Sequence, residues 1–299
     1  MKLVFVLGPT ASGKTALAVE LCERLGGEVV SCDSQQAYRG LDIGTAKPSA
    51  VERARVRHHL LDVAEPHEQL DAGGYVALAD AAIVELRGRG KVAIVSGGTF
   101  LWARALRYGL APAPPRDAGV RARLEAEASS LGVNLLHDRL ATIDPVAAAK
   151  IHATDPVRTI RALEVWEVAG VRLSELQARH GFRTPREPDV RLVLDVPRDE
   201  LDRRIARRTK AMFAGGLLDE TARFAKAARS RLSRLIGYRE ALAHLDGGLG
   251  YDEAVALADT ATRQYARRQL TWLRAEMDLT PVTPDASPGA VAELVRGLL

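Results

Sequence analysis

The sequence predicts an α/β fold: a mostly parallel, P-loop NTPase-like sheet flanked by helices, with a helical insertion domain. Three observations predict this class. Apolar runs of five to seven residues, typical of buried parallel strands, are separated by helical patterns. The first run leads directly into GPTASGKT, which matches a phosphate-binding P-loop between a strand and a helix. Two proline-rich stretches enclose a long segment that has no convincing strand.

The elements of the core follow from these runs in chain order. A strand over residues 3–7, LVFVL, precedes the P-loop at 8–15, and the helix after the loop has its apolar residues on one face. Further strands are predicted at 28–32, 91–95 and 190–196. Because helical patterns separate these strands, they are expected to pair in parallel.

The segment between the proline-rich stretches is predicted to be helical. Asp144-Pro145 and Asp155-Pro156 each match an N-cap followed by proline in the first helical turn, and Gly170 is predicted to end a helix. The predicted domains are a core of residues 1–112 and 187–299 and a helical insertion of residues 113–186.

Composition excludes several classes of protein. With 299 residues, of which 47% are hydrophobic and 27% charged, the chain can bury a substantial core. No apolar run is long enough for a membrane span or a signal peptide, so we expect a cytoplasmic protein with no membrane contact. The spacing of Cys22 and Cys32 matches neither a metal site nor a disulfide framework, and both are expected to be reduced.

Positive charge is concentrated in the last third of the chain. Residues 201–239 contain eleven Lys or Arg and three Asp or Glu, and residues 263–274 contain four arginines and no acidic residue. These segments carry +8 and +4, so the remainder carries −8 within a total of +4. Such segregation is expected of a face that binds a polyanion, because neutralised phosphates release counterions. The alternative is a set of solvated helix faces.

Polar side chains follow three of the predicted strands. Lys14 and Thr15 come from the P-loop, Asp33 follows the second strand, and Thr99 follows the strand at 91–95 after two glycines. In open α/β sheets ligands bind beyond the carboxyl ends of the strands, so these residues are expected to meet at one site. Taken singly, Asp33 could instead cap a helix, and the two glycines could form only a tight turn.

Two kinds of chemistry stay open at such a site. Asp195, at the end of RLVLD, could be the Walker-B aspartate of an ATPase or kinase, although this pattern often occurs by chance. Asp33 is followed by Ser34, Gln35 and Gln36, so its carboxylate stands among amide and hydroxyl groups. That set suits the edge of a nucleobase, and in particular the exocyclic amine of adenine.

Seven sequence strings indicate which protein family the whole chain resembles. In chain order they are GPTASGKT, DSQQAYRGLDIGTAKP, HHLLD, GGTFLWARAL, DPVAAAKIHATDPVRTIRALEV, IGYRE and TRQYARRQLTWLR. Together they span nearly the whole chain, and they resemble the bacterial tRNA dimethylallyltransferases, also called tRNA isopentenyltransferases. The strings DIGTAKP and RRQLTWLR are far more specific than the P-loop.

The resemblance implies what the P-loop holds and what happens to it. It implies that the loop binds the diphosphate of dimethylallyl diphosphate rather than ATP. The dimethylallyl group would pass to N6 of the adenosine just 3′ of the anticodon in tRNAs that read codons starting with U, with release of diphosphate. The implied partners are this donor and the tRNA anticodon stem-loop, and we expect the enzyme to act as a monomer.

The resemblance also implies roles for individual residues. Asp33 would accept the proton of the amine, and Thr99 would hydrogen-bond near the bridging oxygen or the amine. Lys14, Arg204 and a Mg²⁺ ion held by the Thr15 hydroxyl would neutralise the departing diphosphate. The residues implied to bind the diphosphate are Thr10, Ala11, Ser12, Gly13, Lys14 and Thr15.

RNA binding is implied for a further set, because the target base must be flipped out of the anticodon loop and its neighbours must be held. For each arginine in this set the alternative is simple solvation on a helix surface. The residues are Asp33, Ser34, Gln35, Gln36, Thr99, Arg121, Arg158, Arg161, Arg234, Gly237, Tyr238 and Arg239.

Two departures from the family pattern concern the tunnel for the prenyl chain. Trp102 stands where tyrosine is more usual, and QLDAGGYV at 69–76 replaces a more common Tyr-Ser-Ala-x-x-Phe pattern. Two other functions stay open at this stage. The chain could prenylate free adenine nucleotide, or it could be an ATP-binding, RNA-stimulated P-loop ATPase with Asp195 as its metal ligand.

Overall fold

The computed structural model describes residues 2–299, which form two compact units. The core unit comprises the residues up to Arg107 together with Arg186–Leu299, and the insertion unit is Tyr108–Pro185. The predicted boundaries at 112–113 and 186–187 therefore shift to 107–108 and 185–186. A physical reason is that the backbone N–H of Arg186 donates to the carbonyl of Arg107 at 2.7 Å, which ties the outgoing and returning segments within the core.

The core contains a six-stranded sheet in the order β3-β2-β4-β1-β5-β6, and all of its strands pair in parallel. The four predicted strands are confirmed with small shifts at their ends, and two short edge strands were missed. The strands are β1 (Leu3–Leu7), β2 (Gly27–Ser31), β3 (His58–His59), β4 (Val92–Gly97), β5 (Asp189–Leu194) and β6 (Thr280–Val282).

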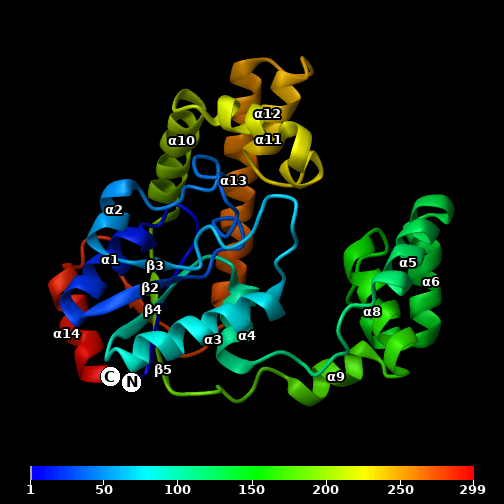
Figure 1. Ribbon diagram of the computed structural model, residues 1–299, viewed down its shortest axis with the longest axis horizontal. Helices are drawn as coiled ribbons and strands as arrows, with labels where there is room; N and C mark the ends of the chain where they lie inside the picture. Colours follow the sequence, from blue (N-terminus) through cyan, green and yellow to red (C-terminus); the bar gives the residue numbers. More distant parts are fainter. Residues whose placement is uncertain (1) are drawn as a thin grey trace. The chain divides into compact units, whose positions relative to one another are not determined.

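Helices cover both faces of this sheet (Figure 1). Alternating strand residues supply two cores: Val4 and Val6 of β1 pack with α1, α10 and α14, whereas Leu3 and Phe5 pack with α3 and α4. The helices of the core are α1 (Lys14–Leu25), α2 (Ala50–Arg55), α3 (Ala72–Gly88), α4 (Phe100–Tyr108), α10 (Arg198–Ala214), α11 (Leu217–Leu232), α12 (Tyr238–Leu245), α13 (Tyr251–Arg274) and α14 (Pro288–Leu298).

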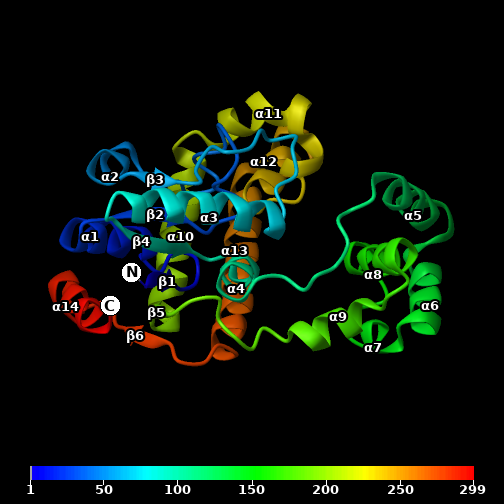
Figure 2. The ribbon, with the colours of Figure 1, turned by 60° about the horizontal axis from the view of Figure 1, so that its bottom comes forward.

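A third apolar cluster lies beyond the carboxyl ends of the strands. It joins Tyr38 and Leu41, from the segment after β2, to buried side chains of α11, α12 and α13. Figure 2 shows α11 and α12 beside one end of the long helix α13. The segment after β2 is therefore packed against the basic C-terminal part of the chain.

The insertion unit is built from helices, as predicted. Its apolar core includes Leu124, Leu136 and Leu163. The three end signals are confirmed: the side chains of Asp144 and Asp155 cap helices that begin with proline, and Gly170 ends a helix in the left-handed region. The helices are α5 (Ala118–Leu131), α6 (Val133–Ile143), α7 (Pro145–Ala148), α8 (Pro156–Ala169) and α9 (Leu173–His180).

The structure bears on two expectations from composition, which concern membrane-spanning helices and the two cysteines. Among residues 2–299, none of the helices combines the length and apolar character needed to cross a membrane. Cys22 and Cys32 are both buried free thiols. Burial raises the pKa of both, to about 12 for Cys32, so neither is a reactive thiolate at neutral pH.

Candidate active site

A pocket of about 420 Å³ opens at the carboxyl edge of the sheet. Its walls come from the P-loop, the segment after β2 and the loop before α2. The second half of α10, the first residue of α11, the connection from α11 into α12, and α13 complete them. Several predicted site residues that lie far apart in the sequence share this pocket. They are Thr10, Asp33, Ser34, Gln35, Arg234, Gly237, Tyr238 and Arg239.

Asp33 follows β2 directly and both caps a turn and lines the pocket. Its Oδ1 atom accepts hydrogen bonds from the backbone N–H groups of Gln35 at 2.9 Å and Gln36 at 3.4 Å. The capping role considered from the sequence therefore coexists with a place in the pocket. Beside it, Gln35 Oε1 is buried and has no hydrogen-bond partner among the described residues. Two residues with acceptor oxygens thus line one pocket, as an incoming amine would require.

Thr99 connects the ends of β2 and β4. Its hydroxyl accepts from the backbone N–H of Ser34 at 2.9 Å and donates to Ser34 Oγ at 3.2 Å. Its backbone N–H donates to the carbonyl of Cys32 at 3.2 Å. Gly97 makes this approach possible, because a Cβ there would lie 2.0 Å from the same carbonyl oxygen. Thr99 therefore holds the Asp33 segment in place and lies behind the residues that line the pocket.

Two cationic side chains, Lys14 of the P-loop and Arg204 of α10, donate to the P-loop backbone. Lys14 Nζ donates to the carbonyl of Pro9 at 2.6 Å, and Arg204 Nη1 donates to the carbonyl of Ser12 at 3.2 Å. Burial lowers the pKa of Lys14 to about 8, with Asp33 opposing and Arg208 adding to the shift. The Ser12 hydroxyl is buried and has no partner among residues 2–299. These groups suit a small, highly charged anion.

The remaining predicted P-loop residues shape this loop. Ala11 adopts a positive φ of 63°, and Gly13 is the N-cap of α1 with a φ of 100°. Thr15 lies in the first turn of α1, directly after Lys14. Backbone N–H groups at this helix start add to the positive potential of the loop.

Arg208 is a site residue that the sequence reasoning missed. Its Nη2 atom donates to Thr10 Oγ1 at 2.5 Å, and its Nε atom is buried with no partner among the described residues. Burial lowers the pKa of Arg208, and Asp33 partly offsets this effect. Arg208 lies one helical turn after Arg204, so their shared face of α10 was the available signal.

Comparisons with known proteins identify the family of this chain. Residues 36–276 match the family model described as IPP transferase. The chain belongs to the IPP transferase family. It is 54% identical to a tRNA dimethylallyltransferase of Anaeromyxobacter dehalogenans strain 2CP-C, with 99% of both chains covered. Because this chain belongs to the family and is so similar to its relatives, it is an enzyme, a prenyltransferase. The resemblance predicted from the sequence is confirmed.

Solved structures agree with the fold of this IPP transferase family member. The full-length tRNA isopentenylpyrophosphate transferase of Bacillus halodurans is 36% identical, with a TM-score of 0.71 and coverage of 99% of this chain and 96% of that one. A eukaryotic dimethylallyltransferase described as acting on tRNA is 24% identical, with a TM-score of 0.83 and coverage of 100% and 80%. The latter supports the fold alone.

Gln269 of α13, in the family-like string RRQLTWLR, was also missed as a site residue. Its Oε1 atom accepts from the backbone N–H of Thr10 at 2.7 Å, and its Nε2 atom donates to the carbonyl of Gly98 at 2.9 Å. The side chain is only 4% exposed. A single buried amide thus joins the P-loop to the turn that carries Thr99.

Replacing Gln269 with glutamate should raise the Michaelis constant for the prenyl donor about tenfold, because a carboxylate can still accept from Thr10 but repels the Gly98 carbonyl. Steady-state kinetics with varied donor would measure this. Gln264→Glu makes the same change at an exposed position of α13 and should leave the constant unaltered. An equal effect of both variants would show that added charge alone is responsible.

Three arginines predicted to bind RNA lie in the insertion unit of this family member, where they differ in their environment. Arg121 and Arg161 both pair with Glu164, which is 0% exposed, and Arg161 also donates to the carbonyl of Pro114 at 2.7 Å. The side chain of Arg158 is 68% exposed and lies 3.5 Å from Asp155. Arg158 is therefore the most available of the three for a phosphate.

Gln36 and Trp102 do not line the pocket described above. Gln36 Nε2 instead donates to the carbonyls of Thr45 and Ala46 at 3.3 and 3.0 Å, so it supports the pocket wall. Trp102 stacks on Tyr75 with ring centroids 4.3 Å apart. The two departures from the family pattern thus meet in the core between α3 and α4.

Asp195, the candidate Walker-B residue, lies after β5 on the side of β6. Its backbone N–H donates to the carbonyl of Val282 at 2.9 Å, and the residue is exposed. It is not among the residues that line the pocket. This position gives no support to the ATPase alternative.

Proposed function

We propose that this chain transfers the dimethylallyl group of dimethylallyl diphosphate to N6 of the adenosine just 3′ of the anticodon, in tRNAs that read codons starting with U. Diphosphate is the second product. The observation that carries this proposal is the single pocket that holds Asp33 at one wall and Thr10, tied to Arg208, at another. Family membership supports the same reaction.

The chemical step needs a base at one end of the pocket. A bond forms between N6 of adenine and C1 of the dimethylallyl group while the bond from C1 to the diphosphate oxygen breaks. The N6 proton passes to the Asp33 carboxylate, because the amine lone pair is delocalised into the ring and is a poor nucleophile unless the proton is accepted. Gln35 Oε1, which lacks a partner among residues 2–299, would accept the second N6 hydrogen.

The leaving group needs positive charge at the other end. Lys14, Arg204 and Arg208 would pair with the diphosphate, and the buried Ser12 hydroxyl would donate to it. These groups are fixed before the reaction by their contacts with the P-loop backbone and Thr10. They therefore stabilise charge as it develops on the departing oxygen, with little rearrangement.

Magnesium would add to this stabilisation. The described residues contain no cluster of three or more His, Cys, Asp or Glu side chains that could hold a metal. Mg²⁺ commonly binds through few protein ligands and substrate phosphates, so the Thr15 hydroxyl at the start of α1 fits such a site. We propose that Thr15 and the diphosphate hold the ion, which would neutralise phosphate charge.

The RNA would be held mainly through its phosphates. Arg234 and Arg239 are exposed and line the pocket, where they would flank the flipped adenosine. Arg121, Arg158 and Arg161 of the insertion unit would contact the anticodon stem-loop. We propose that the enzyme acts on tRNA as a monomer in the cytoplasm.

Arg158→Ala should reduce the salt dependence of tRNA binding, because each lost phosphate contact lowers the log–log slope by roughly 0.7 to 0.9. Binding titrations at several salt concentrations would measure the slope, and donor affinity should barely change. Arg123→Ala is the matched control, since Arg123 is exposed but paired with Glu127 and Glu167. An unchanged slope for Arg158→Ala would place that side chain on a solvated helix face.

One assay separates the proposed function from its alternatives. The purified protein is incubated with Mg²⁺ and dimethylallyl diphosphate together with tRNA or free adenosine monophosphate, and nucleosides are identified by mass spectrometry. A parallel incubation with Mg²⁺ and ATP, with and without tRNA, is followed by release of phosphate. We expect a prenylated adenosine only from tRNA. A product from the free nucleotide would favour that alternative, and tRNA-stimulated ATP hydrolysis that Lys14→Ala abolishes would favour the ATPase.

A further inference from the structure

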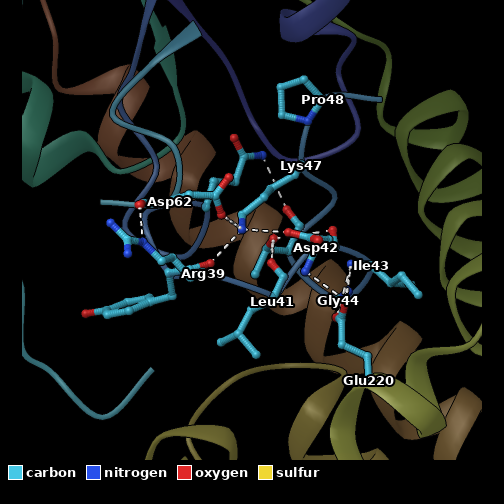
Figure 3. Close-up of polar contacts among 12 residues, drawn as sticks. Arg39, Leu41, Asp42, Ile43, Gly44, Lys47, Pro48, Asp62 and Glu220 are labelled. Atoms are coloured by element: carbon cyan, nitrogen blue, oxygen red, sulfur yellow. Dashed lines mark hydrogen bonds and ion pairs between the residues drawn. The ribbon is translucent and has the colours of Figure 1, made fainter. Parts of the chain in front are cut away.

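The loop at residues 42–44 is fixed by a buried carboxylate (Figure 3). Glu220, in the first turn of α11, is 5% exposed. Its two oxygens accept hydrogen bonds from the backbone N–H groups of Asp42 at 2.9 Å, Ile43 at 2.9 and 3.1 Å and Gly44 at 3.1 Å. Three successive amides therefore share one side chain that lies 176 to 178 residues away in the sequence.

The same carboxylate also fixes Tyr238. The Tyr238 hydroxyl donates to Glu220 Oε1 at 2.6 Å, and burial raises the pKa of Tyr238 well above its usual value, so the hydroxyl stays protonated. The ring packs against Gly44 so closely that a Cβ there would lie 2.4 Å from it. Gly44 and Tyr238 both line the active-site pocket, whereas Glu220 does not.

Lys47, three residues after Gly44, adds contacts at the start of the loop. Its side chain is 1% exposed, and its Nζ atom donates to the carbonyl of Tyr38 at 2.6 Å and to Asp42 at 2.7 Å. It also pairs with Asp62, as Figure 3 shows. The loop is therefore held by Glu220 at all three amides and by Lys47 at Asp42, and its position relative to Tyr238 depends on Glu220.

We propose that Glu220 is a positioning residue for the flipped RNA base, acting through Gly44 and Tyr238. This inference rests on the proposed function. The wall that these two residues form continues into Arg239, which is exposed, lines the same pocket and donates to Glu240 at 2.9 Å. A base that enters the pocket then meets a preformed surface, so less ordering is required on binding. The diphosphate end, held by Lys14 and Arg208, does not depend on Glu220.

Glu220→Gln tests this role. A glutamine has one acceptor oxygen and turns an NH₂ group toward backbone donors, so part of the cluster must lose its partner. We expect the Michaelis constant for tRNA to rise by about 10- to 100-fold. The dissociation constant of the donor should stay within about twofold, because no donor contact is removed.

Glu28→Gln is the matched control. Glu28 is also a buried glutamate with several partners, Arg89 and His59, but it lies at the start of β2, at the opposite end of that strand from Asp33. A merely structural effect of losing a buried carboxylate should appear in both variants as lower thermal stability. Only Glu220→Gln should separate the tRNA constant from the donor constant.

Tyr238→Phe shows whether the two residues act as a unit. Removing the hydroxyl alone leaves the three backbone hydrogen bonds, so its effect on the tRNA constant should be about 2- to 10-fold. Combined with Glu220→Gln, it should add less than it does alone, because that variant already disturbs the cluster to which the hydroxyl belongs. Effects that multiply would show that the residues act independently and would overturn the coupling.

Hydrogen exchange gives a readout that does not depend on activity. The amides of residues 42–44 should exchange faster in Glu220→Gln than in the unchanged protein. In Glu28→Gln they should exchange at the rate of the unchanged protein. Unchanged exchange, or equal shifts in the tRNA and donor constants, would overturn the positioning role even if the unchanged protein transfers the prenyl group. Absence of transfer by the unchanged protein would instead overturn the proposed function.

Discussion

Replacing Asp33 with asparagine should lower the single-turnover rate of prenyl transfer by about 10² to 10⁴-fold, the range expected for loss of a general base. Asparagine has the same shape, and its Oδ1 atom can still accept the hydrogen bonds from the backbone of Gln35 and Gln36. The turn should therefore persist, and tRNA affinity should stay within a few-fold. Rapid-quench kinetics with saturating substrates would measure the rate.

Asp195→Asn provides the control for this prediction. Asp195 also follows a strand of the sheet, but it is exposed and does not line the pocket. We expect its rate to match that of the unchanged protein. Near-normal transfer by Asp33→Asn would rule out its role as the base, and a loss of activity confined to Asp195→Asn would point back to a Walker-B mechanism.

Replacing Lys14 with alanine should weaken donor binding by about 10- to 100-fold, because charge-assisted hydrogen bonds to phosphate are lost. The transfer step should slow as well, since the lysine meets diphosphate charge in the ground state and in the transition state. Titration calorimetry would give the affinity. A variant that binds the donor normally would show that the P-loop serves another ligand.

The pKa of Lys14 adds a pH dependence to donor binding. Burial lowers this pKa to about 8, so the side chain is mostly an ammonium at pH 7 and mostly neutral at pH 9.5. Only the ammonium pairs with diphosphate, so donor affinity should be highest below pH 8 and fall as pH rises through 8. Lys14→Arg should remove most of this dependence, because arginine stays charged. A flat profile in the unchanged protein would contradict the assignment.

The sequence was sufficient for the parts of the site that follow strands. The buried apolar runs located β1, β2, β4 and β5, and the rule that ligands bind beyond parallel strands placed the P-loop, Asp33 and Thr99 at one edge. The edge strands β3 and β6 have two and three residues, and β6 contains Pro281, so neither gives a periodic signal.

The missed residues lie on helices distant in the chain from what they contact. Arg208 contacts Thr10 across 198 residues, and Gln269 contacts it across 259. Helical periodicity shows which residues share a face but not which loop that face meets. Glu220 was hidden for the same reason, since it is one of three acidic residues in a basic segment and nothing in the sequence shows that it binds three backbone amides.

The most direct test of the account compares two anticodon stem-loops that differ at one position. One carries adenosine at the target site, and the other carries inosine, which has oxygen in place of the exocyclic amine. Both are incubated with the purified protein, Mg²⁺ and dimethylallyl diphosphate, and the nucleosides are identified by mass spectrometry. We predict a dimethylallyl group on N6 of the adenosine and no product from the inosine stem-loop. Equal modification of both, or transfer to another nucleoside, would contradict the assignment of Asp33 and its pocket to the adenine amine.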